Sequence, residues 1–150
     1  MILEQFIDKN ECYDKTLVCE DKVKLTLKCN KREFYKVLID TKDTSKLKNE
    51  ITRCDYVIAT TDLKDIIIYV ELKGEDLQKA FDQISNTHNF LNEKFGKRYI
   101  AITYTGTPKA SSILQHNTIL FKKKNFQLPF FTSTGALTLK YDSETQEISK

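Results

Sequence analysis

The chain has 150 residues, of which 40% are hydrophobic and 30% charged, and its formal net charge is +3. This length and balance indicate one globular domain over residues 1–150 and exclude the disordered, collagen-like and low-complexity classes. No apolar run approaches the ~20 residues of a membrane span, and the amino terminus lacks a secretory signal, so we expect a cytoplasmic (intracellular, not secreted) protein with no membrane partner.

The positive charge is concentrated in one part of the chain. Residues 94–141 contain eight Lys or Arg and no Asp or Glu, whereas residues 1–93 contain 15 basic and 18 acidic residues. Such asymmetry indicates a polyanionic partner, with nucleic acid the leading class, and the alternative is a solvated basic face with no partner. The four cysteines lack the spacing of a zinc site, and we expect them to be reduced.

Hydrophobic periodicity predicts the elements of the first half in chain order. A short helix over 2–7 precedes a hairpin with strands over 23–29 and 34–39, and the polar stretch 41–53 is predicted to be a loop. Strands over 54–59 and 66–72 flank a polar turn. The run Ile66–Val70 is apolar on both faces, which is typical of a central strand that is covered on both sides.

The second half is predicted to alternate between helices and strands. An apolar stripe from Leu77 to Phe95 indicates a long helix that begins near Asp76 and ends at Gly96, with His88 packed on the stripe. A strand over 98–104, a helix from 107 to 124 and final strands over 126–132 and 136–141 follow. This order predicts an α/β fold with a central mixed sheet flanked by helices.

Two acidic residues are predicted to meet at the end of the central strand pair. With a turn centred near Leu63, the residue numbers of antiparallel partners sum to about 126, so Asp55 lies opposite Glu71, and Lys73 projects from the same face. Neighbouring carboxylates repel each other without a cation, and their oxygen atoms, with the carbonyl of Leu72, suit Mg²⁺ or Mn²⁺. Such a metal activates water and polarises a phosphoryl group, while Lys73 would orient or deprotonate the attacking water or hold a phosphate oxygen.

The acid-x-Lys tripeptide is common in this charged chain. It also occurs as Glu20/Lys22, Asp40/Lys42 and Asp62/Lys64. Asp40 is the main rival, because the predicted hairpin would place it opposite Asp21. We favour Glu71 because it ends the most apolar strand and has a partner acid in register, and the alternative is a surface ion cluster at a sheet edge.

These residues resemble a known family. The segment 54–58 with its Cys-Asp-Tyr-Val-Ile, the segment 69–74 with its Tyr-Val-Glu-Leu-Lys-Gly, and the following helix with Gln83 look like the core of the PD-(D/E)XK nuclease superfamily. That superfamily includes restriction enzymes, Holliday-junction resolvases and repair exonucleases. The resemblance covers roughly residues 54–105 and implies a restriction-endonuclease-like αβββαβ core.

The resemblance also implies the parts of the site. Asp55, Glu71 and Lys73 would form the metal-dependent catalytic centre, and Gln83 resembles the polar residue that many members add from the following helix. An additional acid from the first helix has three possible counterparts, Glu4, Glu11 and Glu20, and the sequence does not choose between them.

The sequence thus predicts a Mg²⁺- or Mn²⁺-dependent nuclease that acts on DNA, with RNA not excluded. The flanking phosphates would be bound by basic residues of the second half, namely Lys97, Arg98, Lys109, Lys122, Lys123 and Lys124. The alternative is a catalytically inactive nuclease-like fold that binds nucleic acid or protein. A homodimer or a subunit of a larger complex also remains open, as does endo- versus exonuclease action.

Overall fold

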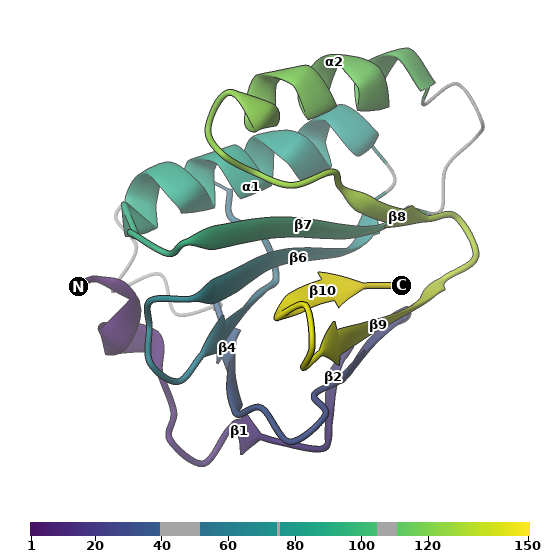
Figure 1. The fold of residues 1–150 in the computed structure, drawn as a ribbon. Helices are drawn as coiled ribbons and strands as arrows, with labels where there is room; N and C mark the ends of the chain where they lie inside the picture. Colours follow the sequence, from purple (N-terminus) through teal and green to yellow (C-terminus); the bar gives the residue numbers. More distant parts are fainter. Residues whose placement is uncertain (40–51, 75, 105–110) are drawn as a thin grey trace.

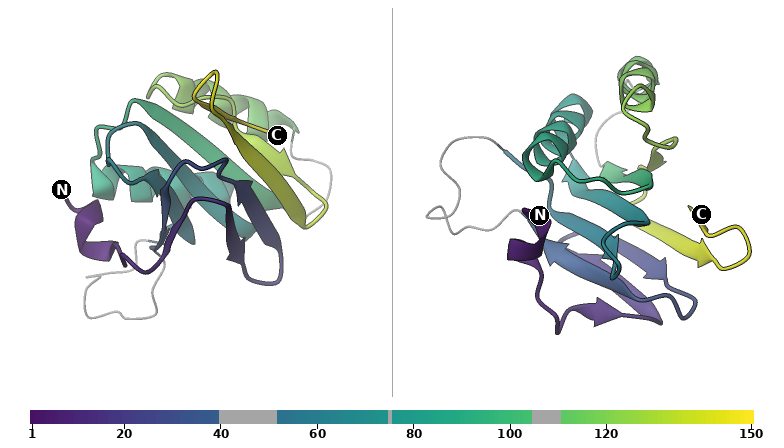
Figure 2. Two further views of the ribbon diagram at one scale, coloured as in Figure 1. Left: turned by 60° about the horizontal axis from the view of Figure 1, so that its bottom comes forward. Right: turned by 60° about the vertical axis from the view of Figure 1, so that its left-hand side comes forward.

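The computed structural model describes residues 1–39, 52–74, 76–104 and 111–150, apart from the side chains of Lys73, Gly74 and Ser111. The described elements form three layers, in which two helices cover one face of a six-stranded sheet and a four-stranded sheet covers the other (Figures 1 and 2). The predicted α/β class is confirmed. The helices that flank the central sheet both lie on one of its faces, and a second sheet covers the other.

The helices and strands follow one another along the chain in this order. They are η1 (Leu3–Phe6), β1 (Cys12–Tyr13), β2 (Thr16–Glu20), β3 (Lys24–Lys28), β4 (Phe34–Leu38), β5 (Tyr56–Thr60), β6 (Ile66–Gly74), α1 (Leu77–Leu91), β7 (Lys97–Tyr104), α2 (Ser111–Lys122), β8 (Phe130–Thr132), β9 (Ala136–Asp142) and β10 (Glu147–Ser149). The predicted amino-terminal helix is a four-residue 3₁₀ helix. The predicted start of the second helix at 107–110 lies outside the described residues.

The central sheet has the strand order β1-β4-β5-β6-β7-β8. Strands β4, β5 and β6 form an antiparallel meander, and helix α1 then crosses over to β7, which runs parallel to β6. Tyr56 pairs with Val70 and Val57 with Tyr69, which is the predicted register. The turn is fixed by Leu63 at φ 58° and by Asp62, whose Oδ1 accepts hydrogen bonds from Thr60 Oγ1 and the Lys64 N–H.

The four-stranded sheet has the order β10-β9-β3-β2 and corrects the predicted hairpin. Strand β3 pairs with β2 and, in parallel, with β9, while β4 joins β1 and β5 in the central sheet. Asn30 and Lys31, at φ 51° and 70°, turn the chain from one sheet to the other. The alternation of Leu25 and Leu27 correctly indicated a strand with one buried face, but it carried no information about the partner strand.

Helix α1 begins as predicted and ends early. The Asp76 side chain accepts the Lys79 N–H, at 3.1 Å, as the N-cap. The helix stops at Leu91, because Asn92 adopts the left-handed conformation at φ 46° and its N–H bonds back to the carbonyl of His88. Residues 92–96 therefore leave the helix axis and carry Glu93 and Phe95 into the protein interior.

Two apolar cores lie on opposite faces of the central sheet. One packs α1 and α2 against alternate residues of the central strands, such as Val57, Ile67 and Tyr69. The other packs the intervening residues, such as Ile68 and Val70, against the inner face of the four-stranded sheet. Strand β6 is therefore buried on both faces, as its unbroken apolar run predicts.

Candidate metal centre

Asp55 and Glu71 come together at the carboxyl end of β6. The pairing of β5 with β6 ends at Tyr56 and Val70, so Asp55 and Glu71 are the next residues on the two segments. Tyr69 faces the helices, and Glu71 lies two residues further along β6 on the same face. The Oδ2 atom of Asp55 accepts the Leu72 N–H at 2.7 Å, which holds the carboxylate against the end of β6.

The two carboxylates also act on a common neighbour. Burial raises the pKa of the Cys54 thiol, and the negative charges of Glu71 and Asp55 raise it further. Glu71 itself is 5% exposed, and Asp55 is half-buried. The structure thus places both carboxylates within electrostatic range of one buried thiol.

Gln83 holds the segment that leads to Asp55. Its Nε2 donates to the carbonyl of Arg53 at 3.3 Å, and Asn86 Nδ2 donates to the carbonyl of Thr52 at 3.1 Å. Thr87 Oγ1 accepts the Cys54 N–H at 3.0 Å. One polar edge of α1 therefore sets the position of Asp55.

Asn86 and Thr87 are the positioning residues that the sequence reasoning missed. They lie three and four residues after Gln83, so all three share one side of the helix. This spacing was visible in the sequence and is the signal by which they could have been found. Thr87 is fully buried, and its hydroxyl also donates to the carbonyl of Gln83 at 2.7 Å.

The donors fit a hard cation that prefers oxygen ligands, such as Mg²⁺ or Mn²⁺, better than a metal that prefers nitrogen or sulfur ligands. Among the residues that the structure describes, no group of three or more His, Cys, Asp or Glu is placed to hold a metal. The set at the end of β6 is two carboxylates and the backbone of Leu72, and Mg²⁺ is commonly held by one or two carboxylates with waters completing its shell. The backbone of Lys73 belongs to β6, and its side chain lies outside the described residues.

The three glutamates proposed as an additional ligand lie on different elements. Glu4 is exposed on η1, and Glu20 ends β2 opposite Lys24. Glu11 lines a cavity of about 300 Å³ beside Tyr56, where its carboxylate pairs with Lys36 at 3.5 Å. The choice between them stays open. The rival Asp40 lies outside the described residues.

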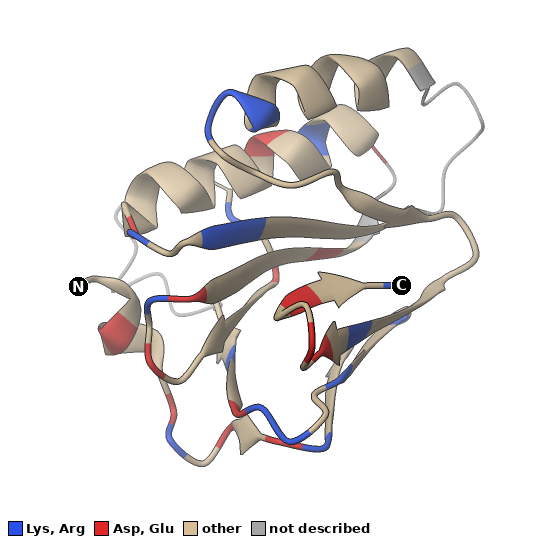
Figure 3. Cartoon of the chain, in the orientation of Figure 1, with Lys and Arg blue, Asp and Glu red and all other residues tan. Residues whose placement is uncertain are grey.

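The basic residues predicted to hold phosphate lie away from this end of the sheet. Lys97 is the partner of Ile66 in the β6–β7 register. Ile66 lies five residues before Glu71 on β6, which corresponds to about 16 Å along the strand. Figure 3 shows blue segments at the start of β7 and at the end of α2, on the left of the view. Lys122, Lys123 and Lys124 are exposed at the end of α2, and Lys109 lies outside the described residues.

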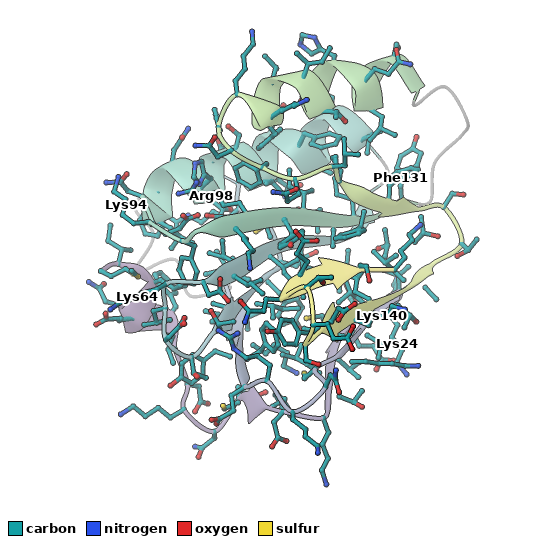
Figure 4. The ribbon with its side chains drawn as sticks, in the orientation of Figure 1. Lys24, Lys64, Lys94, Arg98, Phe131 and Lys140 are labelled. Atoms are coloured by element: carbon teal, nitrogen blue, oxygen red, sulfur yellow. The ribbon has the colours of Figure 1, made fainter. Side chains whose placement is uncertain are left out.

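Two of these cations are paired within the fold. Lys97 Nζ lies 3.5 Å from a carboxylate oxygen of Asp65 and donates to the carbonyl of Gln146 at 2.7 Å. Arg98, labelled in Figure 4, donates from Nε to Glu93 Oε1 at 2.8 Å. A phosphate at either side chain would compete with a carboxylate that is already in contact.

Glu93 is the centre of a buried polar cluster that the sequence did not predict. Its Oε2 accepts the Tyr69 hydroxyl at 2.5 Å and lies 3.3 Å from Nδ1 of His88. His88 is packed among Tyr69 and Phe126, as predicted from its place on the apolar stripe. The cluster joins β6, the end of α1 and the start of β7. The Glu93 carboxylate accepts its hydrogen bonds from groups of the protein itself.

Searches of protein-family models, of curated proteins and of solved structures found no match to this chain. In the described part of the chain, no helix has the length and apolar character needed to cross a membrane.

Proposed function

We propose that this chain is a metal-dependent nuclease that hydrolyses phosphodiester bonds in DNA. The observation that carries the proposal is that Asp55 and Glu71 both lie near Cys54 at the end of β6, with Asp55 held by the Leu72 N–H. A Mg²⁺ or Mn²⁺ bound there would lower the pKa of a water and neutralise charge that develops on the phosphoryl group.

The order of elements gives further support. The antiparallel meander β4-β5-β6, the crossover helix α1 and the parallel strand β7 follow one another as in the αβββαβ arrangement of PD-(D/E)XK nucleases. The chain differs in having the 3₁₀ helix η1 and three strands before the meander.

Each residue has a distinct role in the proposal. Asp55 and Glu71 would hold the metal, and the backbone of Leu72 orients Asp55 through its N–H. Lys73, the next residue of β6, would bind a phosphate oxygen or the attacking water. Gln83 is a positioning residue, because it holds the carbonyl of Arg53 two residues before Asp55.

A catalytically inactive fold that binds nucleic acid or protein is the second candidate. The burial of Glu71, which is 5% exposed, favours it, because a Mg²⁺ ion that keeps several waters needs room at its ligands.

Exposed apolar side chains on α2 and after it also suit a contact with another subunit. They are Leu128, Ile119 and Leu120, which are 71%, 59% and 43% exposed.

The test is cleavage of duplex, branched and single-stranded DNA, and of RNA, by the purified chain with Mg²⁺ or Mn²⁺. We expect Glu71→Gln and Lys73→Ala to lower the rate about 100-fold or more, as removal of a group that stabilises transition-state charge does elsewhere. The matched controls are Glu20→Gln and Lys22→Ala, which change the same tripeptide pattern at exposed positions at the end of β2 and in the turn after it. Equal rates in the wild type and the Glu71 and Lys73 variants would overturn the proposal.

Calorimetry with Mn²⁺ separates the two candidates. If the chain is a nuclease, we expect it to bind Mn²⁺. The variants Asp55→Asn and Glu71→Gln should abolish that binding, and Glu20→Gln should leave it intact. Absence of Mn²⁺ binding together with retained binding of DNA would favour the inactive fold.

A further inference from the structure

A basic pocket lies at one end of the four-stranded sheet, on a different layer from Asp55 and Glu71. Its volume is about 540 Å³, within the usual range for small-molecule sites. It is lined by side chains from the start of β2, the end of β3, the turn that follows β3 and the end of β9. These residues are Asp14, Lys15, Thr16, Lys28, Asn30, Lys31, Lys140 and Tyr141.

The strand register explains why the basic side chains converge. Thr16 is the partner of Lys28 across β2 and β3, and Lys28 is the partner of Lys140 across β3 and β9. The three residues therefore form one row across the sheet. Their neighbours Leu17, Leu27 and Leu139 are buried, so this row is on the outer face. Lys140 is labelled on β9 in Figure 4.

The turn after β3 is held at a fixed position on the rim of the pocket. The Lys31 N–H bonds to the carbonyl of Asp14 at 2.9 Å, and Asn30 Nδ2 lies 3.5 Å from the carbonyl of Tyr141. Both Asn30 and Lys31 have positive φ, so the turn has a specific shape. These contacts tie the loop to β9 and hold the rim of the pocket in place.

The pocket carries uncompensated positive charge. Its lining contains four lysines and one aspartate. Within the described residues, none of the four lysine ammonium groups forms an ion pair or donates a hydrogen bond to the protein, whereas Lys36 and Lys97 elsewhere both have carboxylate partners. Like charges directly opposite each other on neighbouring strands, as Lys28 and Lys140 are, destabilise a sheet. An anion between them would relieve that repulsion.

The buried residue of the lining, Tyr141, adds no net charge to the pocket. Tyr141 is 6% exposed, and its hydroxyl accepts a hydrogen bond from Arg32 at 3.1 Å. The Arg32 guanidinium also pairs with Asp62 and Asp65, at 3.3 and 3.1 Å, so its own charge is compensated. The net attraction for an anion therefore comes from the four lysines, with the Thr16 hydroxyl as a neutral donor.

We propose that this pocket binds the phosphate groups of a polyanion. Lysine ammonium groups bind phosphate as point charges with three donors each, and several around one cavity match a chain of phosphates better than a single carboxylate. The phosphates come either from a nucleic-acid backbone or from a free polyphosphate such as that of a nucleoside triphosphate. The site needs no metal and is independent of the proposed nuclease activity.

The test is binding of a fluorescein-labelled single-stranded oligonucleotide, measured by anisotropy in EDTA, with inorganic tripolyphosphate as the competitor. The test variant is Lys28→Gln with Lys140→Gln. The control is Lys22→Gln with Lys24→Gln, which removes the same charge from an exposed position on the same sheet but outside the pocket. Thermal melting checks that both variants remain folded.

We expect the pocket variant to bind the oligonucleotide about ten-fold or more weakly than the wild type. The steepness of the plot of log K against log salt concentration should fall by about 1.4, as the loss of two phosphate contacts to a single strand predicts. The control should stay within about two-fold. If tripolyphosphate binds directly and displaces the oligonucleotide, a free polyphosphate is a ligand, and if only the oligonucleotide binds, the backbone is the source. Equal losses in both variants, or no loss in the pocket variant, would overturn the inference whether or not the protein cleaves DNA.

Discussion

The buried carboxylate of Glu93 offers the sharpest test of how this fold uses its charges. Its side chain is fully buried and accepts hydrogen bonds from Tyr69, Arg98 and the Phe95 N–H. The substitution Glu93→Gln keeps the shape, removes the charge and puts an amide N–H₂ where an acceptor was. The Arg98 guanidinium, which is 13% exposed, would then be a nearly buried charge without a counter-ion.

The expected loss can be worked out from these contacts. Breaking one partner of a buried pair costs about 3–5 kcal/mol, and the amide oxygen of Gln keeps some of the hydrogen bonding, so we expect about 3 kcal/mol. For a chain of this length that corresponds to a fall in Tm of about 6–12 °C. Glu144→Gln, at an exposed turn position, is the matched control and should change stability by less than about 0.5 kcal/mol.

Urea denaturation of Glu93→Gln, Arg98→Met and the double variant gives the coupling between the two residues. Because both single variants leave a buried group unsatisfied, the double variant should lose less stability than the two single losses combined, by about 1–3 kcal/mol. Additive losses, or a Glu93→Gln variant as stable as the wild type, would refute the assignment of Arg98 to an internal pair. Arg98 would then again be available to a phosphate, as the sequence predicted.

The pH dependence gives a second check. Burial alone would raise the pKa of Glu93, but the hydrogen bonds from His88 and Tyr69 and the charge of Arg98 lower it below its ordinary value. A carboxylate with a lowered pKa in the folded state stabilises the fold above its unfolded pKa of about 4.3, and that contribution is lost as the pH falls through the folded pKa. The stability gap between wild type and Glu93→Gln should therefore narrow below about pH 4.3 and be constant above it.

Two further predictions concern the segment before Asp55 and the cysteines. Thr87→Val removes the acceptor of the buried Cys54 N–H and should cost about 1–3 kcal/mol in urea denaturation, whereas Thr87→Ser keeps the hydroxyl and should cost about 1 kcal/mol; equal losses would contradict the hydrogen bond. Burial raises the pKa of the Cys19 thiol to about 12 and of the Cys29 thiol to about 11, and Cys54 is also fully buried. Iodoacetamide should therefore label only the half-exposed Cys12 in the native chain, as read by mass spectrometry, and labelling of a buried thiol at the same rate would contradict the packing.

The parts of the fold that the sequence predicted depend on local pattern. The register of β5 and β6 follows from a short turn between two apolar runs, so the pairing of Tyr56 with Val70 is predictable from the sequence alone. The parallel pairing of β3 with β9 joins residues more than 100 positions apart, such as Leu25 and Leu137. An alternating pattern says which side chains face inward and nothing about which strand lies alongside.

The end of α1 shows a second limit. The apolar spacing continues to Phe95, and Phe95 is indeed buried, but it reaches the core from a loop after the left-handed Asn92. A periodic stripe describes burial and does not distinguish a last helical turn from a loop that folds back over the same core. The position of Glu93 depends on this loop, and with it the pairing of Arg98.

Charge counts along the chain do not show which basic side chains are paired, for a related reason. Residues 94–141 contain only positive charge, yet Lys97 and Arg98 meet Asp65 and Glu93 from the acidic first part. Three of the four lysines in the basic pocket, Lys15, Lys28 and Lys31, come from that acidic part. Opposite charges far apart in sequence neutralise each other in the fold, so the lysines that remain unpaired mark a surface that segment counts do not identify.

The two proposed sites lie at opposite ends of the central strands, and this separation limits how they would act together. The pocket adjoins the turn of Asp62 and Asp65 through Arg32, whereas Glu71 lies five residues along β6 from Ile66, about 16 Å away along the strand. One phosphate cannot contact both sites. A nucleic acid that touched both would have to extend over at least about five base-pair steps, at 3.4 Å for each step. If both proposals hold, the pocket holds a distant part of the substrate or a separate effector, and the phosphate at the metal centre must be bound by groups near β6, among which Lys73 is the nearest basic residue in the sequence.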